Sequence, residues 1–147
     1  MIKIKNKIKL LVVFLLAIII PILLILKGII RIDVIIQLGE NLQFNFISFF
    51  SVLCGFSFTA VSILISIIDK EQIKRLWDNS YLDNLYYSSF ISMFADLVEI
   101  FVALYIVFNN ITDNIWFVVE IITLSISLLF FVYSIIKLFI LIQDLKL

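Results

Sequence analysis

Four long apolar stretches divide the chain, and each is long enough to cross a membrane. They run over residues 10–30, 46–68, 86–108 and 115–142. A hydrocarbon core of about 30 Å needs about 20 helical residues, and lipid offers the backbone no hydrogen-bond partners, so each stretch is predicted to be a helix. The pattern therefore predicts an all-α integral membrane protein with a single four-helix transmembrane domain over residues 1–147.

Basic residues are distributed unevenly among the segments that flank these spans. Four precede the first span, three lie between the second and third, and two lie at the end of the fourth, whereas two lie where the first span ends. Lys and Arg are enriched in cytoplasmic segments. This distribution predicts that both termini are cytoplasmic. The first span is predicted to be an uncleaved anchor, because its apolar run is longer than that of a secretory signal and no small-residue cleavage site follows it.

The segment after the first span has its own pattern. Apolar residues at positions 30, 32, 34 and 36 are separated mainly by polar ones, and a turn-like cluster follows at residues 39–41. This alternation predicts a short, hairpin-like extended loop on the extracytoplasmic side. A helix lying in the membrane interface is the alternative.

Polar side chains follow one face of the third span. Ser88, Ser92, Asp96, Glu99 and Ala103 recur at spacings of three and four residues, which places them on one side of a helix. A charged carboxylate near the bilayer centre costs at least about 2.5–3.5 kcal/mol. The intramembrane polar stripe of Ser92, Asp96 and Glu99 is therefore predicted to face protein or water.

Two roles remain open for the carboxyl of Asp96. Its depth places it level with residues 125–128 of the fourth span, and no basic residue lies at that depth. The carboxyl is either neutral and hydrogen-bonded to a Ser or Thr of another span, or it lines a hydrated pathway or binds a cation. Glu99 has the same alternatives. Glu120, near the outer end of the fourth span, is predicted to reach an outer-loop base, either Lys27 or Arg31, or to extend to the interface.

Small residues form a stripe along the second span. They are Ser48, Ser51, Gly55, Thr59, Ser62 and Ser66. Membrane helices use such stripes for close backbone approach, because lipid supplies no hydrophobic drive for helix association. The stripe predicts tight helix packing, against either the third span of the same chain or the second span of another copy. A serine-lined pore is the alternative. Thr123, Ser127 and Ser134 form a weaker stripe on the fourth span.

The inner loop, residues 69–85, has an amphipathic beginning. Ile73 and Trp77 share one face and oppose three basic residues, so an extension of the second span is predicted, with Trp77 at the headgroup level. Together with the basic N-terminus, this segment is the predicted docking face for a cytosolic partner. Its residues are Lys70, Lys74, Arg75 and Trp77.

Composition excludes several classes of function. The chain is 64% hydrophobic, against about 45–50% for soluble domains, which argues against a soluble enzyme. It has no His and one Cys, Cys54, so His-based catalysis, an intrachain disulfide and a Cys-cluster metal site are excluded. Its net charge of zero gives no indication of direct nucleic-acid binding. The sequence predicts no enzymatic activity, no metal and no cofactor.

One stretch resembles a known family. Residues 50–64 read FSVLCGFSFTAVSIL and residues 73–76 read IKRL. This combination, over residues 30–110, is similar to small four-span membrane proteins of bacterial anti-phage defence systems, nearest the membrane subunit of the Kiwa system. The resemblance implies a subunit of the bacterial cytoplasmic (inner) membrane that acts with a cytosolic protein, either sensing phage attack or compromising the membrane.

Three hypotheses about function follow. The first is a homo-oligomeric membrane sensor or anchor, with a tetramer as the expected assembly, that signals to a cytosolic partner in anti-phage defence. The second is an oligomeric pore or channel-like effector that depolarises the membrane, with Asp96 and Glu99 facing a shared axis. The third is a small proton-coupled transporter that uses the same carboxyls.

Overall fold

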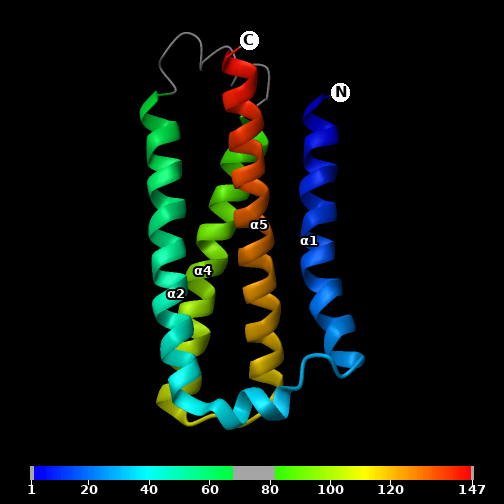
Figure 1. Ribbon diagram of the computed structural model, residues 1–147, viewed down its shortest axis with the longest axis vertical. Coiled ribbons are helices and arrows are strands. Elements are labelled where there is room, and N and C mark those ends of the chain that lie inside the picture. The colour runs from blue at the N-terminus through cyan, green and yellow to red at the C-terminus, as the bar shows by residue number, and fades with distance from the viewer. Residues whose placement is uncertain (1, 68–81, 147) are drawn as a thin grey trace.

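Four long helices stand side by side in the computed structural model, which describes residues 2–67 and 82–146 (Figure 1). They are α1 (Ile2–Leu26), α2 (Ile32–Ile67), α4 (Asp83–Asn109) and α5 (Asn114–Lys146). Each is long and apolar enough to cross a membrane, and the described residues include no strand. The prediction of an all-α membrane protein with four spanning helices is confirmed.

The first helix is shorter at its C-terminal end than the span predicted for it. α1 ends at Leu26, and residues 27–30 form a turn instead of a last helical turn. Gly28 has a φ of 70°, which glycine adopts without steric cost. The chain leaves this turn at the end of the bundle opposite the N-terminus, and the C-terminal end of α5 returns to the N-terminal side (Figure 1).

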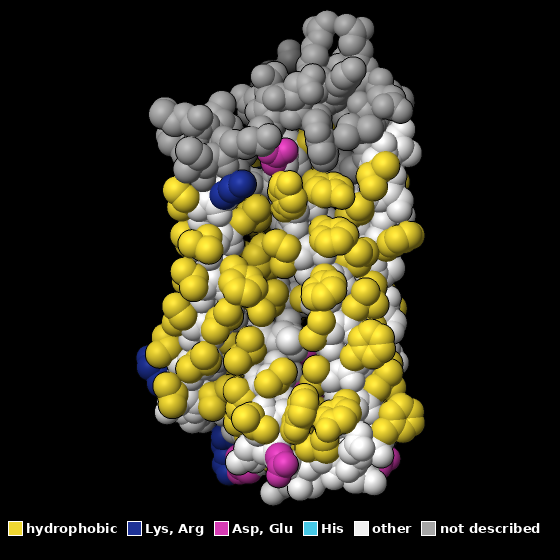
Figure 2. All heavy atoms as spheres, turned by 180° about the vertical axis from the view of Figure 1, so that it is seen from behind, with side chains coloured by type: hydrophobic (Ala, Val, Ile, Leu, Met, Phe, Trp, Pro, Cys, Tyr) yellow, Lys and Arg dark blue, Asp and Glu magenta, His cyan; other side chains and the backbone are white. Residues whose placement is uncertain are grey.

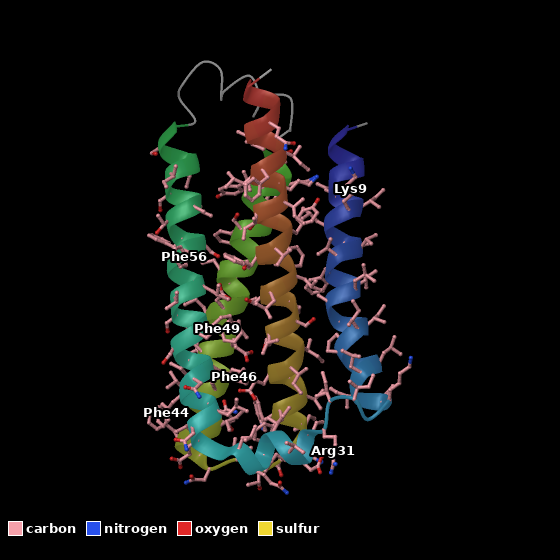
Figure 3. The ribbon with its side chains drawn as sticks, viewed as in Figure 1. Lys9, Arg31, Phe44, Phe46, Phe49 and Phe56 are labelled. Atoms are coloured by element: carbon pink, nitrogen blue, oxygen red, sulfur yellow. The ribbon has the colours of Figure 1, made fainter. Side chains whose placement is uncertain are left out.

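The segment that follows is helical, so the predicted hairpin-like loop is wrong and the helical alternative is correct. The first residues of α2 lie across the end of the bundle before the helix turns to run along it (Figure 3). Ile32, Ile35 and Ile36 are half-buried, whereas Asp33 is exposed and pairs with Arg31 at 2.6 Å. Ile32, Ile35 and Ile36 lie on one face of a helix, as expected for a helix that packs on an apolar surface. A helix also makes all of its own backbone hydrogen bonds there.

Gly39 makes the bend between the two parts of α2. Its φ of 61° and ψ of −151° interrupt the helical backbone. This region of backbone conformation is essentially restricted to glycine. The direction in which the outer segment leaves α2 therefore depends on this residue.

We expect Gly39→Ala to lower the free energy of unfolding by about 1–3 kcal/mol, because alanine is strained in this conformation. A Cβ at Gly39 meets nothing within 4 Å, so the effect is conformational and not a steric clash with neighbours. Unfolding in detergent, followed by circular dichroism, measures it. Gly55→Ala is the matched control, since Gly55 lacks a positive φ and also has open space. Equal stability of Gly39→Ala and wild type would contradict the strain.

α4 is the central helix of the bundle. It packs against α2 on one side and α5 on the other, whereas α1 packs mainly against α5. Ala17 of α1 is fully buried, and the rings of Phe14 and Phe130 are 6.4 Å apart across the α1–α5 contact. Hydrophobic side chains cover the outer face shown in Figure 2, as a lipid-facing surface requires.

Candidate functional site: a buried polar column

Three carboxyl side chains are fully buried in the middle of the bundle. Asp96 and Glu99 come from α4 and Glu120 comes from α5, and each has 0% exposure. All three lie within segments long and apolar enough to span a membrane. Burial inside the protein removes these groups from lipid, as the sequence pattern predicted for the first two.

Each carboxyl has one hydrogen-bond partner on a neighbouring helix. Ser127 Oγ donates to Asp96, and Thr123 Oγ1 donates to Glu99. The amide Nε2 of Gln43, from α2, donates to Glu120 at 3.1 Å. The carboxyls therefore join three helices, and Asp96 meets α5 within residues 125–128, the level that its depth in the span predicted.

Helical spacing explains why these partners meet. Asp96 and Glu99 are three residues apart on α4, and Thr123 and Ser127 are four apart on α5, so each pair lies on one helix face. The two helices are antiparallel, and therefore the later residue on α5 meets the earlier residue on α4. Glu120 continues the α5 face by one turn and meets α2.

Polar groups continue from the carboxyls toward the end of the bundle that carries the termini. Ser92 Oγ donates to the backbone carbonyl of Ser127 at 3.2 Å, and Ser88, one turn further, is fully buried. We call the whole set the buried polar column; its side chains are Gln43, Ser88, Ser92, Asp96, Glu99, Glu120, Thr123 and Ser127. Helical rise along α4 and α5 gives the column a length of about 20 Å, against about 30 Å for a hydrocarbon core.

The second oxygen of each carboxyl is buried without a partner. Asp96 Oδ2, Glu99 Oε1, Glu120 Oε1 and the amide oxygen of Gln43 make no hydrogen bond to the described residues. The one salt bridge among those residues joins Arg31 and Asp33, outside the column. A buried polar atom without a partner costs about 1–3 kcal/mol. We therefore expect each of these oxygens to accept a hydrogen bond from a water molecule or to carry a proton.

The column does not resemble a metal centre or a catalytic dyad. Within the described parts of the chain, no group of three or more His, Cys, Asp and Glu side chains could hold a metal ion. Asp96 and Glu99 bond to different hydroxyls and not to one another. What this arrangement can do chemically is bind and release protons at three successive carboxyls.

The partner predicted for Glu120 is wrong. The sequence predicted contact with Lys27 or Arg31, or extension to the interface, but Glu120 is buried against Gln43. Gln43 follows the turn-like cluster at residues 39–41, so the predicted hairpin-like loop gives it no place beside Glu120. The sequence signal is the seven-residue spacing of Gln43, Phe50 and Ser57, which puts them on one helix face; the structure buries all three.

The small-residue stripe of α2 does not face α4. Ser48, Ser51, Gly55, Thr59, Ser62 and Ser66 are all exposed. α2 instead buries a different face, which includes Phe50, Leu53, Ser57 and Val61. Packing of the stripe against the third span of the same chain is therefore ruled out for this bundle.

Hydroxyls of the stripe bond to their own helix. Ser51 Oγ donates to the Ile47 carbonyl at 2.6 Å, and Thr59 Oγ1 donates to the Gly55 carbonyl at 2.8 Å. A hydroxyl satisfied in this way needs no polar partner outside the helix. The stripe is thus a shallow face with open space at Gly55, where an added Cβ would meet nothing within 4 Å.

The predicted docking residues Lys70, Lys74, Arg75 and Trp77 lie outside the described residues. The amphipathic extension of the second span predicted there lies outside them as well.

Comparison of the chain with protein-family models, with curated proteins and with solved structures gave no match.

Proposed function

We propose that this protein is a channel-like membrane protein that lets protons cross the bilayer through the buried polar column and so depolarises the membrane. The observation that carries this proposal is the burial of three carboxyls at successive levels, each with one bonded and one unpartnered oxygen. Intramembrane acids that line a protein interior are typical of proton relays. The membrane in which we propose that it acts is the bacterial cytoplasmic membrane.

The proposed pathway lies inside each protomer. Asp96, Glu99 and Glu120 are already enclosed by α2, α4 and α5 of one chain. A pore in which Asp96 and Glu99 face an axis shared by several copies would require this bundle to open. Protons need no open pore, because carboxyls, hydroxyls and a few waters transfer them in steps.

Purified protein in liposomes tests this function. The vesicles enclose a pH-sensitive dye, and a potassium gradient with valinomycin sets an inside-negative potential. We expect the interior to acidify in vesicles that contain the protein and to stay constant in protein-free vesicles. Acidification no faster than in protein-free vesicles would contradict proton conduction.

A role in anti-phage defence is a second proposal, and it rests on the resemblance of residues 50–64 and 73–76. In this role the protein is a homo-oligomeric inner-membrane subunit that signals to a cytosolic partner, which docks on Lys70, Lys74, Arg75 and Trp77. A strain expressing the protein with its neighbouring genes is then expected to form fewer phage plaques than a strain lacking it. Equal plaque counts would contradict the defence role and would leave proton conduction to be judged by the vesicle assay.

The exposed stripe of α2 supports self-association. In lipid, small residues allow two helix backbones to approach closely, and neighbouring large side chains then fill the space around them. Phe49, Val52 and Phe56 are exposed beside the stripe and are available for that role. The proposed partner of this face is the same face of a second copy.

A further inference from the structure

A cavity of about 180 Å³ is lined by segments of α2, α4 and the α4–α5 turn. These segments lie at the end of the bundle opposite the two termini (Figure 1). The walls of the cavity come from the bend of α2 around Gly39, from the last turns of α4 and from the turn that leads into α5. Gly39 sets the direction of the outer α2 segment, and a Cβ there would meet nothing within 4 Å. The bend therefore leaves room between α2 and the α4–α5 turn.

Polar side chains form part of the cavity wall. They belong to Glu40, Gln43, Asn110 and Thr112, and among the described residues neither Lys nor Arg lines the cavity. Water in bulk takes up about 30 Å³ per molecule, so a cavity of this size has room for a small cluster of waters. Cavities with polar partners hold water, whereas wholly apolar ones of similar size stay dry. The chemistry of this cavity favours water and protons over anions.

Gln43 joins this cavity to the buried polar column. It lines the cavity, its side chain is 2% exposed, and its amide Oε1 is buried without a partner among the described residues. Its Nε2 donates to Glu120 Oε2 at 3.1 Å, and Glu120 lies fully buried behind it. Two unpartnered oxygens, Gln43 Oε1 and Glu120 Oε1, thus lie at the junction between the cavity and the carboxyls.

We propose that this cavity is the water-filled proton entrance of the column, and that the Gln43 side chain controls access from it to Glu120. This inference rests on the proposed function. In the entry step, a hydronium ion in the cavity transfers a proton to Glu120 when Gln43 rotates aside. One O–H bond breaks in the hydronium, one forms at a Glu120 carboxylate oxygen, and a neutral water remains. Reversal of this step releases a proton to the same cavity.

Thiol accessibility tests whether the cavity is open to water. Val107→Cys, in a Cys54→Ser background, places a thiol on the cavity wall with little change in volume. Phe108→Cys is its control at the same depth, because Phe108 is 78% exposed on the outside of α4 and does not line the cavity. A charged, membrane-impermeant thiol reagent is expected to modify position 107 from one membrane side only and faster than position 108. Equal reaction at both positions would overturn the water-filled entrance.

Two substitutions of Gln43 test its control of access. Gln43→Leu keeps the volume but removes the polar group, and is expected to slow proton flux about tenfold or more. Gln43→Ala removes the barrier between cavity and Glu120, and is expected to raise flux. If Gln43 has only a structural role, neither substitution is expected to raise proton flux; each would lower it or leave it unchanged. Folding of each variant is checked by gel filtration and circular dichroism.

The two proposals fail in different ways. If wild-type protein gives no flux, proton conduction is wrong, whereas reaction at position 107 still decides whether the cavity is open to water. If wild type conducts but Gln43→Leu conducts equally, or position 107 is unreactive, the entrance is wrong and the column conducts by another route.

Discussion

Proton flux is expected to fall to the level of protein-free vesicles in the double variant Asp96→Asn, Glu99→Gln. An amide has nearly the size and shape of a carboxyl, but it does not take up and release a proton at neutral pH. Both residues are fully buried in the column, on one face of α4, so the substitution removes two successive proton-binding groups. The measurement is dye-reported acidification in vesicles at a fixed membrane potential.

The same geometry predicts that the double variant still folds. The carbonyl oxygen of the new amide at position 96 or 99 can accept the hydrogen bond that Ser127 or Thr123 donates in the wild type. The added N–H groups cost about 1–3 kcal/mol each where they find no acceptor, so some loss of stability is expected. Intact helicity and an unchanged gel-filtration profile separate this cost from loss of the bundle.

Asp33→Asn is the matched control for the chemical change. Asp33 is an exposed acid that pairs with Arg31 and belongs neither to the column nor to the cavity wall, so its amide variant should conduct like wild type. A folded double variant that conducts like wild type would show that Asp96 and Glu99 only join helices. Such a result would remove the basis for proton conduction.

Much of the bundle could be predicted from the sequence because lipid restricts the choices. Long apolar runs must be helical, and acids within them must face protein, so Asp96, Glu99 and their level relative to Ser127 followed from spacing and depth. Residues 32–38 were harder, because the alternation at 32, 34 and 36 suits a strand while 32, 35 and 36 share a helix face. A helix is favoured near lipid because it satisfies its own backbone hydrogen bonds. A short pattern of hydrophobic and polar residues does not report this contribution.

Which neighbour a helix face meets could not be predicted in the same way. Spacing identified the small-residue face of α2, but it holds no information on the rotation of α2 about its axis in the bundle. The observed rotation buries Gln43 against Glu120 and packs Phe50, which has 0% exposure, inside. Burying Gln43 gains a hydrogen bond to Glu120. The stripe gains no comparable bond from burial, because the hydroxyls of Ser51 and Thr59 already bond to their own helix backbone.

The outward orientation of the stripe makes a second large effect predictable. Ser51→Cys, in the Cys54→Ser background, is expected to form disulfide-linked dimers on mild oxidation in native membranes. A disulfide needs Cα atoms about 4.4–6.8 Å apart, and direct contact between the stripes of two copies would bring the two residues 51 this close. Phe101→Cys is expected to stay monomeric, since Phe101 is comparably exposed, at 68%, but belongs to α4 and not to the stripe. Equal cross-linking at both positions would indicate random collision in the bilayer.

Adding Gly55→Leu to the Ser51→Cys protein separates contact between stripes from mere proximity. The leucine side chain enters open space in the single chain, so the fold itself is expected to persist. Between two copies, however, it fills the place where backbones approach, and we expect cross-linked dimer to fall about tenfold or more, equivalent to about 1.4 kcal/mol of association free energy. Gly55→Ala keeps a small residue and should retain most of the dimer. If Gly55→Leu cross-links as well as Gly55→Ala, the copies meet through another face and the stripe only contacts lipid.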